Sequence, residues 1–184
     1  MSAPERIFQI CYRWGGEPIA EEERATLSLS LRGERALLQV NAPYAGDPPP
    51  PGPPGHCFGL WTYEVVELFV ASEARPERYL ELELGPHGHF LALSFEEVRA
   101  PNAHQLSAAG AASYRSEQRG ARWSARLSFP QSWLPPAPWR GCAFSIAGVD
   151  GARRHLLSSP LPGEVPDFHQ PTEFPPLPLL SPVE

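Results

Sequence analysis

Short runs of strictly alternating apolar and polar residues, separated by turn sequences, constrain this chain of 184 residues more than any other feature. In the clearest run, Trp123, Ala125, Leu127 and Phe129 fall on one face, and arginines and serines fall on the other, as in a half-buried strand. No segment longer than about ten residues keeps a helical period, whereas roughly eight or nine such strands recur. The sequence therefore predicts an all-β fold, an antiparallel β-sandwich.

Proline clusters mark two segments that cannot join a β-ladder, because proline lacks the amide hydrogen. They are a long loop over residues 43–59 and a C-terminal tail over residues 160–184. The chain length fits one domain over residues 1–184. We expect the tail to wrap around the surface and the long loop to have a functional role.

Composition and charge exclude several classes of function. The net charge of -6 offers no basic patch for nucleic acid. No apolar stretch approaches the roughly 20 residues that span a bilayer, and the apolar run within residues 1–14 is too short for a signal peptide. Three widely spaced cysteines lack the spacing of a disulfide framework or a zinc site. We expect a soluble, cytoplasmic protein without a nucleic-acid or membrane partner.

Glutamates in the predicted central strands are the main candidates for a functional site. Alternation over residues 61–70 and 79–84 puts Glu67, Glu81 and Glu83 on faces opposite the leucines of each strand. If these strands pair, Glu67 lies beside Glu81 or Glu83, with the side chains about 5 Å apart. Like charges so placed repel, so we expect a cation, an arginine or a hydroxyl-rich ligand among them.

Three interpretations of these glutamates stay open. On a solvated face, they would pair with surface arginines such as Arg122 and Arg126. As a catalytic pair, Glu67 and Glu83 would serve a hydrolase or lyase together with a histidine. As binding residues, they would hold a small polar ligand such as a sugar.

Tryptophan side chains extend the binding hypothesis, since indoles stack on the apolar faces of sugars. Alternation puts Trp123 in the core, whereas Trp61, Trp133 and Trp139 are free to contact a ligand. The six histidines lack the spacing of metal sites, and three distant aspartates cannot form a calcium loop. We expect no metal and no cofactor.

Several specific motifs run through residues 7–174: Trp14-x-Gly-x-Pro18, Asn41-Ala-Pro-Tyr44, Trp61-x-Tyr-Glu-Val-Val-Glu67, Tyr79-Leu-Glu-x-Glu83, Pro86-His-Gly88 and Pro166-Asp-Phe-His169. Together they resemble an uncharacterised family of open-reading-frame proteins found in animals (UPF0462-like). Residues 60–95 are also similar to carbohydrate-binding-module family 9 and DOMON-like sandwiches. This second resemblance implies a jelly-roll-like sandwich and binding of a sugar or haem. Tyr63 and Glu64 depart from its pattern, which often has aspartates there, and Met1 is the only methionine available as a haem ligand.

The favoured prediction is a non-catalytic site for a small, carbohydrate-like ligand, covered by the loop over residues 43–59. Its side chains come from the central strands, the turn between them and the tail: Trp61, Tyr63, Glu64, Glu67, Tyr79, Glu81, Glu83, His87, Asp167 and His169. The alternatives are the hydrolase or lyase above, and a protein-interaction scaffold that uses the proline-rich loop and tail.

Overall fold

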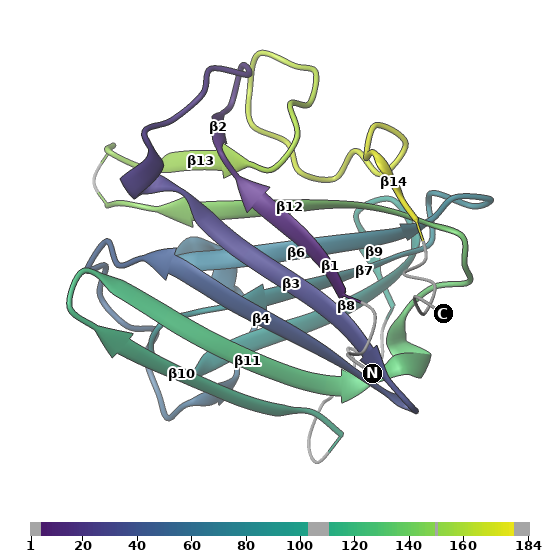
Figure 1. Cartoon of the computed structure of the whole chain (residues 1–184), viewed down its shortest axis with the longest axis horizontal. Coiled ribbons are helices and arrows are strands. Elements are labelled where there is room, and N and C mark those ends of the chain that lie inside the picture. Colours follow the sequence, from purple (N-terminus) through teal and green to yellow (C-terminus); the bar gives the residue numbers. More distant parts are fainter. Residues whose placement is uncertain (1–4, 103–110, 150, 179–184) are drawn as a thin grey trace.

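Two β-sheets pack face to face in the computed structural model, which describes residues 5–102, 111–149 and 151–178 (Figure 1). The smaller sheet has the strand order β1-β3-β4-β11-β10, and all its pairs are antiparallel. Its strands are β1 (Glu5–Ile10), β3 (Ala25–Arg32), β4 (Arg35–Pro43), β10 (Ser113–Arg119) and β11 (Arg122–Pro130). The predicted all-β antiparallel sandwich is confirmed.

The larger sheet has the order β2-β13-β12-β6-β7-β8-β5, with β14 added to β12 and β9 added to β8. Among the described strands, only β5 and β8 pair in parallel. The predicted central strands form the meander β6-β7-β8. The strands are β2 (Tyr12–Arg13), β5 (Gly55–His56), β6 (Val65–Ser72), β7 (Tyr79–Leu84), β8 (His89–Glu97), β9 (Ala100–Pro101), β12 (Trp139–Ala147), β13 (Arg154–Leu157) and β14 (Pro176–Leu177).

Helical structure in the described residues is limited to three single-turn 3-10 helices. They are η1 (Glu21–Glu23), η2 (Leu60–Thr62) and η3 (Gln131–Trp133). None of the helices in this part of the chain has the length and apolar character needed to cross a membrane.

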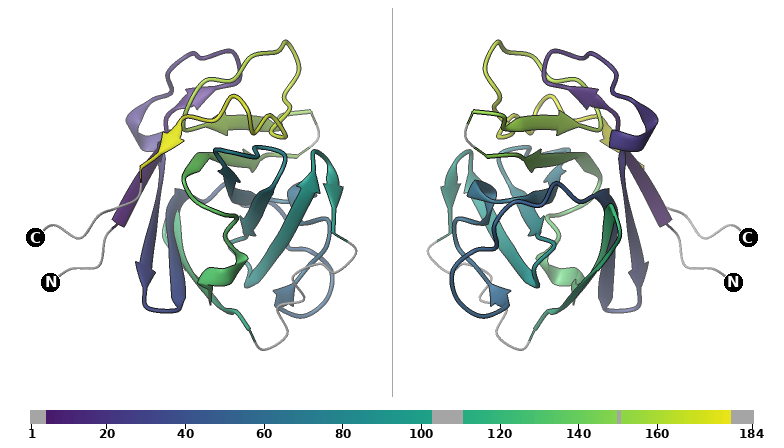
Figure 2. Two further views of the ribbon diagram at one scale, coloured as in Figure 1. Left: turned by 90° about the vertical axis from the view of Figure 1, so that its right-hand side faces the viewer. Right: turned by 90° about the vertical axis from the view of Figure 1, so that its left-hand side faces the viewer.

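The main core lies between the two sheets, which Figure 2 shows as facing layers. Because side chains alternate across a strand, every second residue of each strand enters this core. From the smaller sheet it receives Leu27, Leu38, Trp123 and Phe129, all nearly or fully buried. From the larger sheet it receives Val66, Leu68, Val70, Leu80, Leu82 and Leu84. The leucine faces predicted from the alternation therefore do point inward.

A second apolar cluster covers the outer face of the larger sheet. Leu161, Phe168 and Phe174 of the tail pack there, and the ring of Phe168 stacks on Phe144 of β12 with centroids 4.1 Å apart. The tail pairs with β12 through β14, and residues 179–184 of the predicted tail lie outside the described residues. Both faces of the larger sheet are thus buried over much of their area.

Candidate functional site

A cavity of about 440 Å³ opens on the outer face of the larger sheet, between the meander and the tail. Its volume lies within the range of about 300–1,000 Å³ that is usual for small-molecule sites. Strands β6, β7 and β8 supply its floor, and residues 166–169 of the tail supply one wall. The lining residues are Phe58, Trp61, Glu67, Phe69, Glu81, Leu93, Phe95, Arg99, Pro101, Ile146, His155, Pro166, Asp167, Phe168 and His169.

The glutamates of the meander lie together, as the alternation predicts. Glu67 of β6 is directly opposite Glu83 of β7, and Glu81 is opposite Phe69. Glu67 and Glu81 line the cavity, whereas Glu83 does not. The exposed fractions of Glu67, Glu81 and Glu83 are only 2%, 4% and 0%.

Most oxygens of these buried carboxyl groups receive no hydrogen bond from the other described residues. Glu67 Oε1, Glu81 Oε2 and both carboxyl oxygens of Glu83 accept no hydrogen bond from a donor group elsewhere in the described part of the chain, although Glu81 and Glu83 can share a hydrogen bond while one of the two keeps its proton. Native proteins pair most of their buried polar atoms, because an unpaired one costs about 1–3 kcal/mol. The unpartnered oxygens of Glu67 and Glu81 therefore mark a place where a ligand can add the missing contacts.

Burial makes the acids of this cluster weaker. It raises the pKa of Glu81 to about 7. It also holds the pKa of Glu67 and of Glu83 well above the usual range, and the mutual repulsion of the carboxylates adds to this effect. Arg153 opposes the rise in the pKa of Glu67. A carboxyl that keeps its proton near neutral pH can both donate and accept a hydrogen bond, as a sugar hydroxyl requires.

The interpretation of the glutamates as a solvated face paired with Arg122 and Arg126 is wrong. Both arginines belong to β11 in the other sheet, and the Arg122 Nε donates to Asn41 Oδ1 at 2.7 Å. The physical reason is the tail, which covers the glutamate face and excludes water from it. Alternation within a strand identifies two faces but does not show what covers them.

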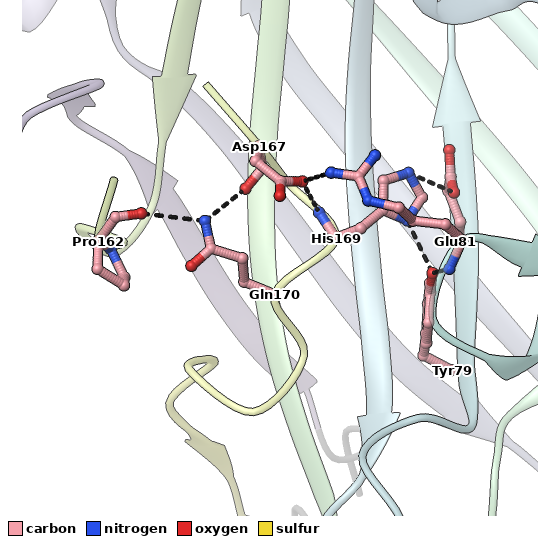
Figure 3. Close-up of polar contacts among 7 residues, drawn as sticks. Tyr79, Glu81, Pro162, Asp167, His169 and Gln170 are labelled. Atoms are coloured by element: carbon pink, nitrogen blue, oxygen red, sulfur yellow. Dashed lines mark hydrogen bonds and ion pairs between the residues drawn. The ribbon is translucent and has the colours of Figure 1, made fainter. Parts of the chain in front are cut away.

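A chain of hydrogen bonds joins β7 to the tail at one side of the cavity (Figure 3). The backbone N–H of Arg99 donates to the Tyr79 hydroxyl at 3.0 Å. The phenolic hydrogen is then free to donate to His169 Nδ1 at 2.7 Å. With Nδ1 as an acceptor, the ring hydrogen is assigned to Nε2, which lies 4.0 Å from Glu81 Oε2. Burial, assisted by the charge of Arg99, lowers the pKa of His169 to about 4, so the ring is neutral near pH 7.

Asp167 holds this side of the cavity in place. Its Oδ1 accepts the backbone N–H of His169 at 3.0 Å and also pairs with the Arg99 guanidinium. Arg99, between β8 and β9, has a φ of 64°, a conformation that residues other than glycine seldom adopt. Backbone strain of this kind clusters at ligand and active sites. The strained turn and the tail are thus fixed to each other beside Glu81.

Two aromatic side chains form the rim of the cavity. Phe58 and Trp61 meet edge to face with centroids 5.1 Å apart, and they are 60% and 37% exposed. The Arg153 guanidinium donates to the backbone carbonyls of Trp61 and Tyr63, which fixes η2 and the segment after it. The rim therefore presents two exposed aromatic rings set nearly perpendicular to each other, and the face of either one can stack on a ligand ring.

Three predicted ligand residues, Tyr63, Glu64 and His87, are not among the cavity-lining residues. Tyr63 packs against the second apolar cluster, whereas Glu64 and His87 contact the proline-rich loop. The Glu64 carboxylate accepts the backbone N–H groups of Ala45, Gly46 and Asp47 at 2.9, 3.1 and 3.3 Å. His87 Nε2 lies 3.0 Å from the Asp47 carbonyl oxygen. These side chains hold the start of the loop, and only the end of the loop reaches the cavity, at Phe58.

Two tryptophans that were predicted to be free to contact a ligand, Trp133 and Trp139, pack instead against the core between the sheets. Nearby prolines suggested that both residues lie in a loop and can reach a ligand. That expectation was wrong, because β12 begins at Trp139 and carries its side chain into the sandwich.

Several lining residues were missed in the sequence. Arg99 and His155 carry no local signal, because one depends on an unusual φ and the other on pairing of β13 with β12. Phe58 did have a signal, as an aromatic residue at the end of the loop expected to cover the site. Within residues 5–102, 111–149 and 151–178, no three His, Cys, Asp or Glu side chains are arranged to hold a metal ion.

Comparison with known sequences finds close similarity to animal proteins. The chain is 34% identical over 177 residues to the UPF0462 protein C4orf33 homolog of Mus musculus, covering 92% of this chain and 89% of the mouse protein. It is 33% identical over 170 residues to the human UPF0462 protein C4orf33, covering 88% and 82% of the two chains. No family model matches the sequence.

Comparison with solved structures finds the same sandwich in proteins of low sequence identity. A Bacteroides uniformis protein, named for an assumed carbohydrate-binding role, superimposes with a TM-score of 0.68 at 18% identity, covering 94% of this chain and 84% of that one. A family 9 carbohydrate-binding module from Caldicellulosiruptor kristjanssonii, solved with glucose, gives a TM-score of 0.51 at 8% identity, covering 82% and 73%. At these identities the likeness shows the fold.

Proposed function

The chain belongs to the UPF0462 family, and from the geometry of its cavity we propose that it binds a small polar, carbohydrate-like ligand without transforming it. One observation carries the proposal: Glu67 and Glu81 line the cavity with almost no exposure and with carboxyl oxygens that lack partners. A ligand with several hydroxyl groups supplies those partners. The carbohydrate-binding names of the structural neighbours support this class of ligand.

The two sides of the cavity suit the two sides of a sugar ring. The exposed faces of Trp61 and Phe58 accept the C–H surface of the ring. On the other side, Glu67 and Glu81 meet the hydroxyls, and the Nε2 hydrogen of neutral His169 offers a further donor. Free thiols on Cys11, Cys57 and Cys142 agree with the proposed cytoplasmic location.

The alternative of a hydrolase or lyase with Glu67 and Glu83 has less support. Two catalytic carboxyls must both reach the bond that breaks, yet Glu83 is fully buried and does not line the cavity. Binding without catalysis needs only the side chains that line it.

Calorimetric titration of the purified protein with monosaccharides and disaccharides tests the proposal. We expect a sugar that binds, and a loss of affinity of about tenfold or more in Trp61→Ala and in Glu81→Leu, since the first removes a stacking face and the second removes both carboxyl oxygens. Glu117→Gln, an exposed change in β10 of the other sheet, should leave binding unchanged. A full panel without heat of binding would contradict the proposal and favour the protein-interaction scaffold.

A further inference from the structure

We propose that the ligand of this cavity carries a primary ammonium group beside its hydroxyls, as an amino sugar does, and that Glu81 and Glu67 hold that group. This inference rests on the proposed function and names its ligand class more narrowly. It starts from the imbalance between three carboxyl groups at or beside the floor of the cavity, whose pKa values burial raises, and the lack of a charged cation in contact with them among the described residues.

Three carboxyls cluster there, and no arginine of the described residues contacts them directly: the charge of Arg153 only lowers the pKa of Glu67 from a distance, and its guanidinium is held by backbone carbonyls. Arg99 pairs with Asp167, and Arg153 donates to the carbonyl oxygens of Gly148, Trp61 and Tyr63. In the described part of the chain, the only cationic partner within 4.0 Å of the three glutamates is His169, at 4.0 Å from Glu81. The His169 ring is neutral, because Nδ1 accepts the hydrogen bond of the Tyr79 hydroxyl and only Nε2 carries a hydrogen.

A ligand ammonium corrects this imbalance. Buried carboxylates are costly without an opposite charge, and a hydrogen bond between charged partners is about twice as strong as one between neutral partners. An ammonium has three hydrogens to donate, which suits several acceptor oxygens on one side of a cavity. The unpartnered oxygens of Glu67 and Glu81 are such acceptors.

The rest of the lining also favours a cation. Trp61, Phe69, Phe95 and Phe168 line the same cavity as Glu67 and Glu81, and aromatic faces attract ammonium groups. Outside the cavity, the net charge of the whole chain is -6, which raises the local concentration of cations rather than anions. A neutral sugar uses the rim and the hydroxyl contacts but supplies no positive charge beside which the buried carboxyls can ionise.

Titration calorimetry at pH 7 with glucosamine, glucose and N-acetylglucosamine tests this inference. We expect glucosamine to bind about tenfold or more tightly than either neutral sugar. N-acetylglucosamine controls for the substituent, because it keeps the nitrogen and removes the charge. Glucosamine binding should also release protons, detected as a dependence of the heat on the ionisation enthalpy of the buffer, because the ammonium favours the ionised carboxylates.

Glutamine substitutions test whether the charge of the two glutamates, rather than the size of their side chains, causes the preference for glucosamine. Glu81→Gln and Glu67→Gln keep the size of the side chain, and each should reduce the preference for glucosamine while glucose still binds. Glu117→Gln should keep the full preference, and circular dichroism should confirm that all variants fold. Equal affinity for glucose and glucosamine would overturn this inference and leave the proposed function standing. Failure of all three sugars to bind would overturn this inference, and the full panel of monosaccharides and disaccharides would then decide on the proposed function.

Discussion

The hydroxyl of Tyr79 in β7 lies 2.7 Å from Nδ1 of His169, although 90 positions separate the two residues in the sequence. The same hydroxyl accepts the backbone N–H of Arg99 at 3.0 Å. One side chain of the sheet thus joins the turn after β8 and the C-terminal tail, and it sets the orientation of the His169 ring in the cavity. The second apolar cluster surrounds this contact, since Tyr79 also stacks on Phe95 with centroids 4.2 Å apart.

Replacing Tyr79 with Phe should weaken the attachment of the tail while leaving the apolar packing intact. Removal of the hydroxyl leaves the Arg99 N–H and His169 Nδ1 without this partner, so we expect the free energy of unfolding to fall by about 1–3 kcal/mol. Urea denaturation with an unchanged m-value measures the loss. Tyr12→Phe is the control, because no hydrogen bond of the Tyr12 hydroxyl is found in the described residues. Equal losses in both variants would argue against the special role of Tyr79.

Glu64 is expected to be a structural residue of the proline-rich loop. Glu64→Ala removes the acceptor of three backbone N–H groups, those of Ala45, Gly46 and Asp47. We expect a loss of stability on the order of 3 kcal/mol and faster cleavage within residues 43–59 in limited proteolysis. Glu117→Ala removes a glutamate exposed on β10 and should change neither measurement. If loop cleavage stays at the wild-type rate, Glu64 does not anchor the loop.

Gly88, in the turn before β8, allows the loop to pack closely on the meander. A Cβ added there would lie 2.8 Å from Pro54 Cβ, and the residue has a φ of 85°. Gly120 has a φ of 61° with no atom within 4 Å of its added Cβ, so Gly120→Ala measures the cost of the backbone conformation alone. We expect Gly88→Ala to destabilise the protein by at least about 1 kcal/mol more than Gly120→Ala. Equal thermal midpoints would show that Pro54 moves aside freely.

Local alternation was enough to predict most of the sandwich. The alternation of Trp123 to Phe129 corresponds to β11, and the alternation over residues 79–84 corresponds to β7. The second apolar cluster could not be predicted from local alternation, because it depends on Phe168 and Phe174 of the tail packing on a sheet built from earlier residues. A proline-rich sequence shows that the tail is not a regular strand, but it does not show which face the tail covers.

The candidate site was predictable where it lies on paired strands. Register follows from the hydrophobic pattern, so the neighbourhood of Glu67 and Glu83 could be inferred from the sequence. Placement of Asp167 and His169 beside them came from family motifs, and the structure brings these residues to the same cavity. Arg99 could not be found, because its position depends on a φ of 64° and on a contact with the tail.

The buried glutamates should make the protein less stable as the pH rises toward and through neutrality. Burial raises the pKa of Glu81 from 4.5 to about 7, so the folded state holds this proton more tightly than the unfolded state. The stability from this group is therefore fully present below pH 4.5 and is lost as the pH rises through about 7. Glu67 and Glu83 shift in the same direction. The loss in the free energy of unfolding that is due to Glu81 alone is on the order of 3 kcal/mol.

His169 has the opposite effect and must be removed to reveal this trend. Burial lowers the pKa of His169 from 6.5 to about 4, so its contribution is present above pH 6.5 and is lost as the pH falls through about 4. In a His169→Gln background, urea unfolding at pH 6.5, 7, 7.5 and 8 should therefore show a steady fall in the free energy of unfolding, because the lowered pKa of His56 and of His155 opposes the trend only below about pH 6.5. Adding Glu81→Gln should reduce the slope, because the amide does not titrate and only Glu67 and Glu83 of the cluster still do. If the double variant and His169→Gln show the same slope, ionisation of Glu81 does not limit the stability of the fold.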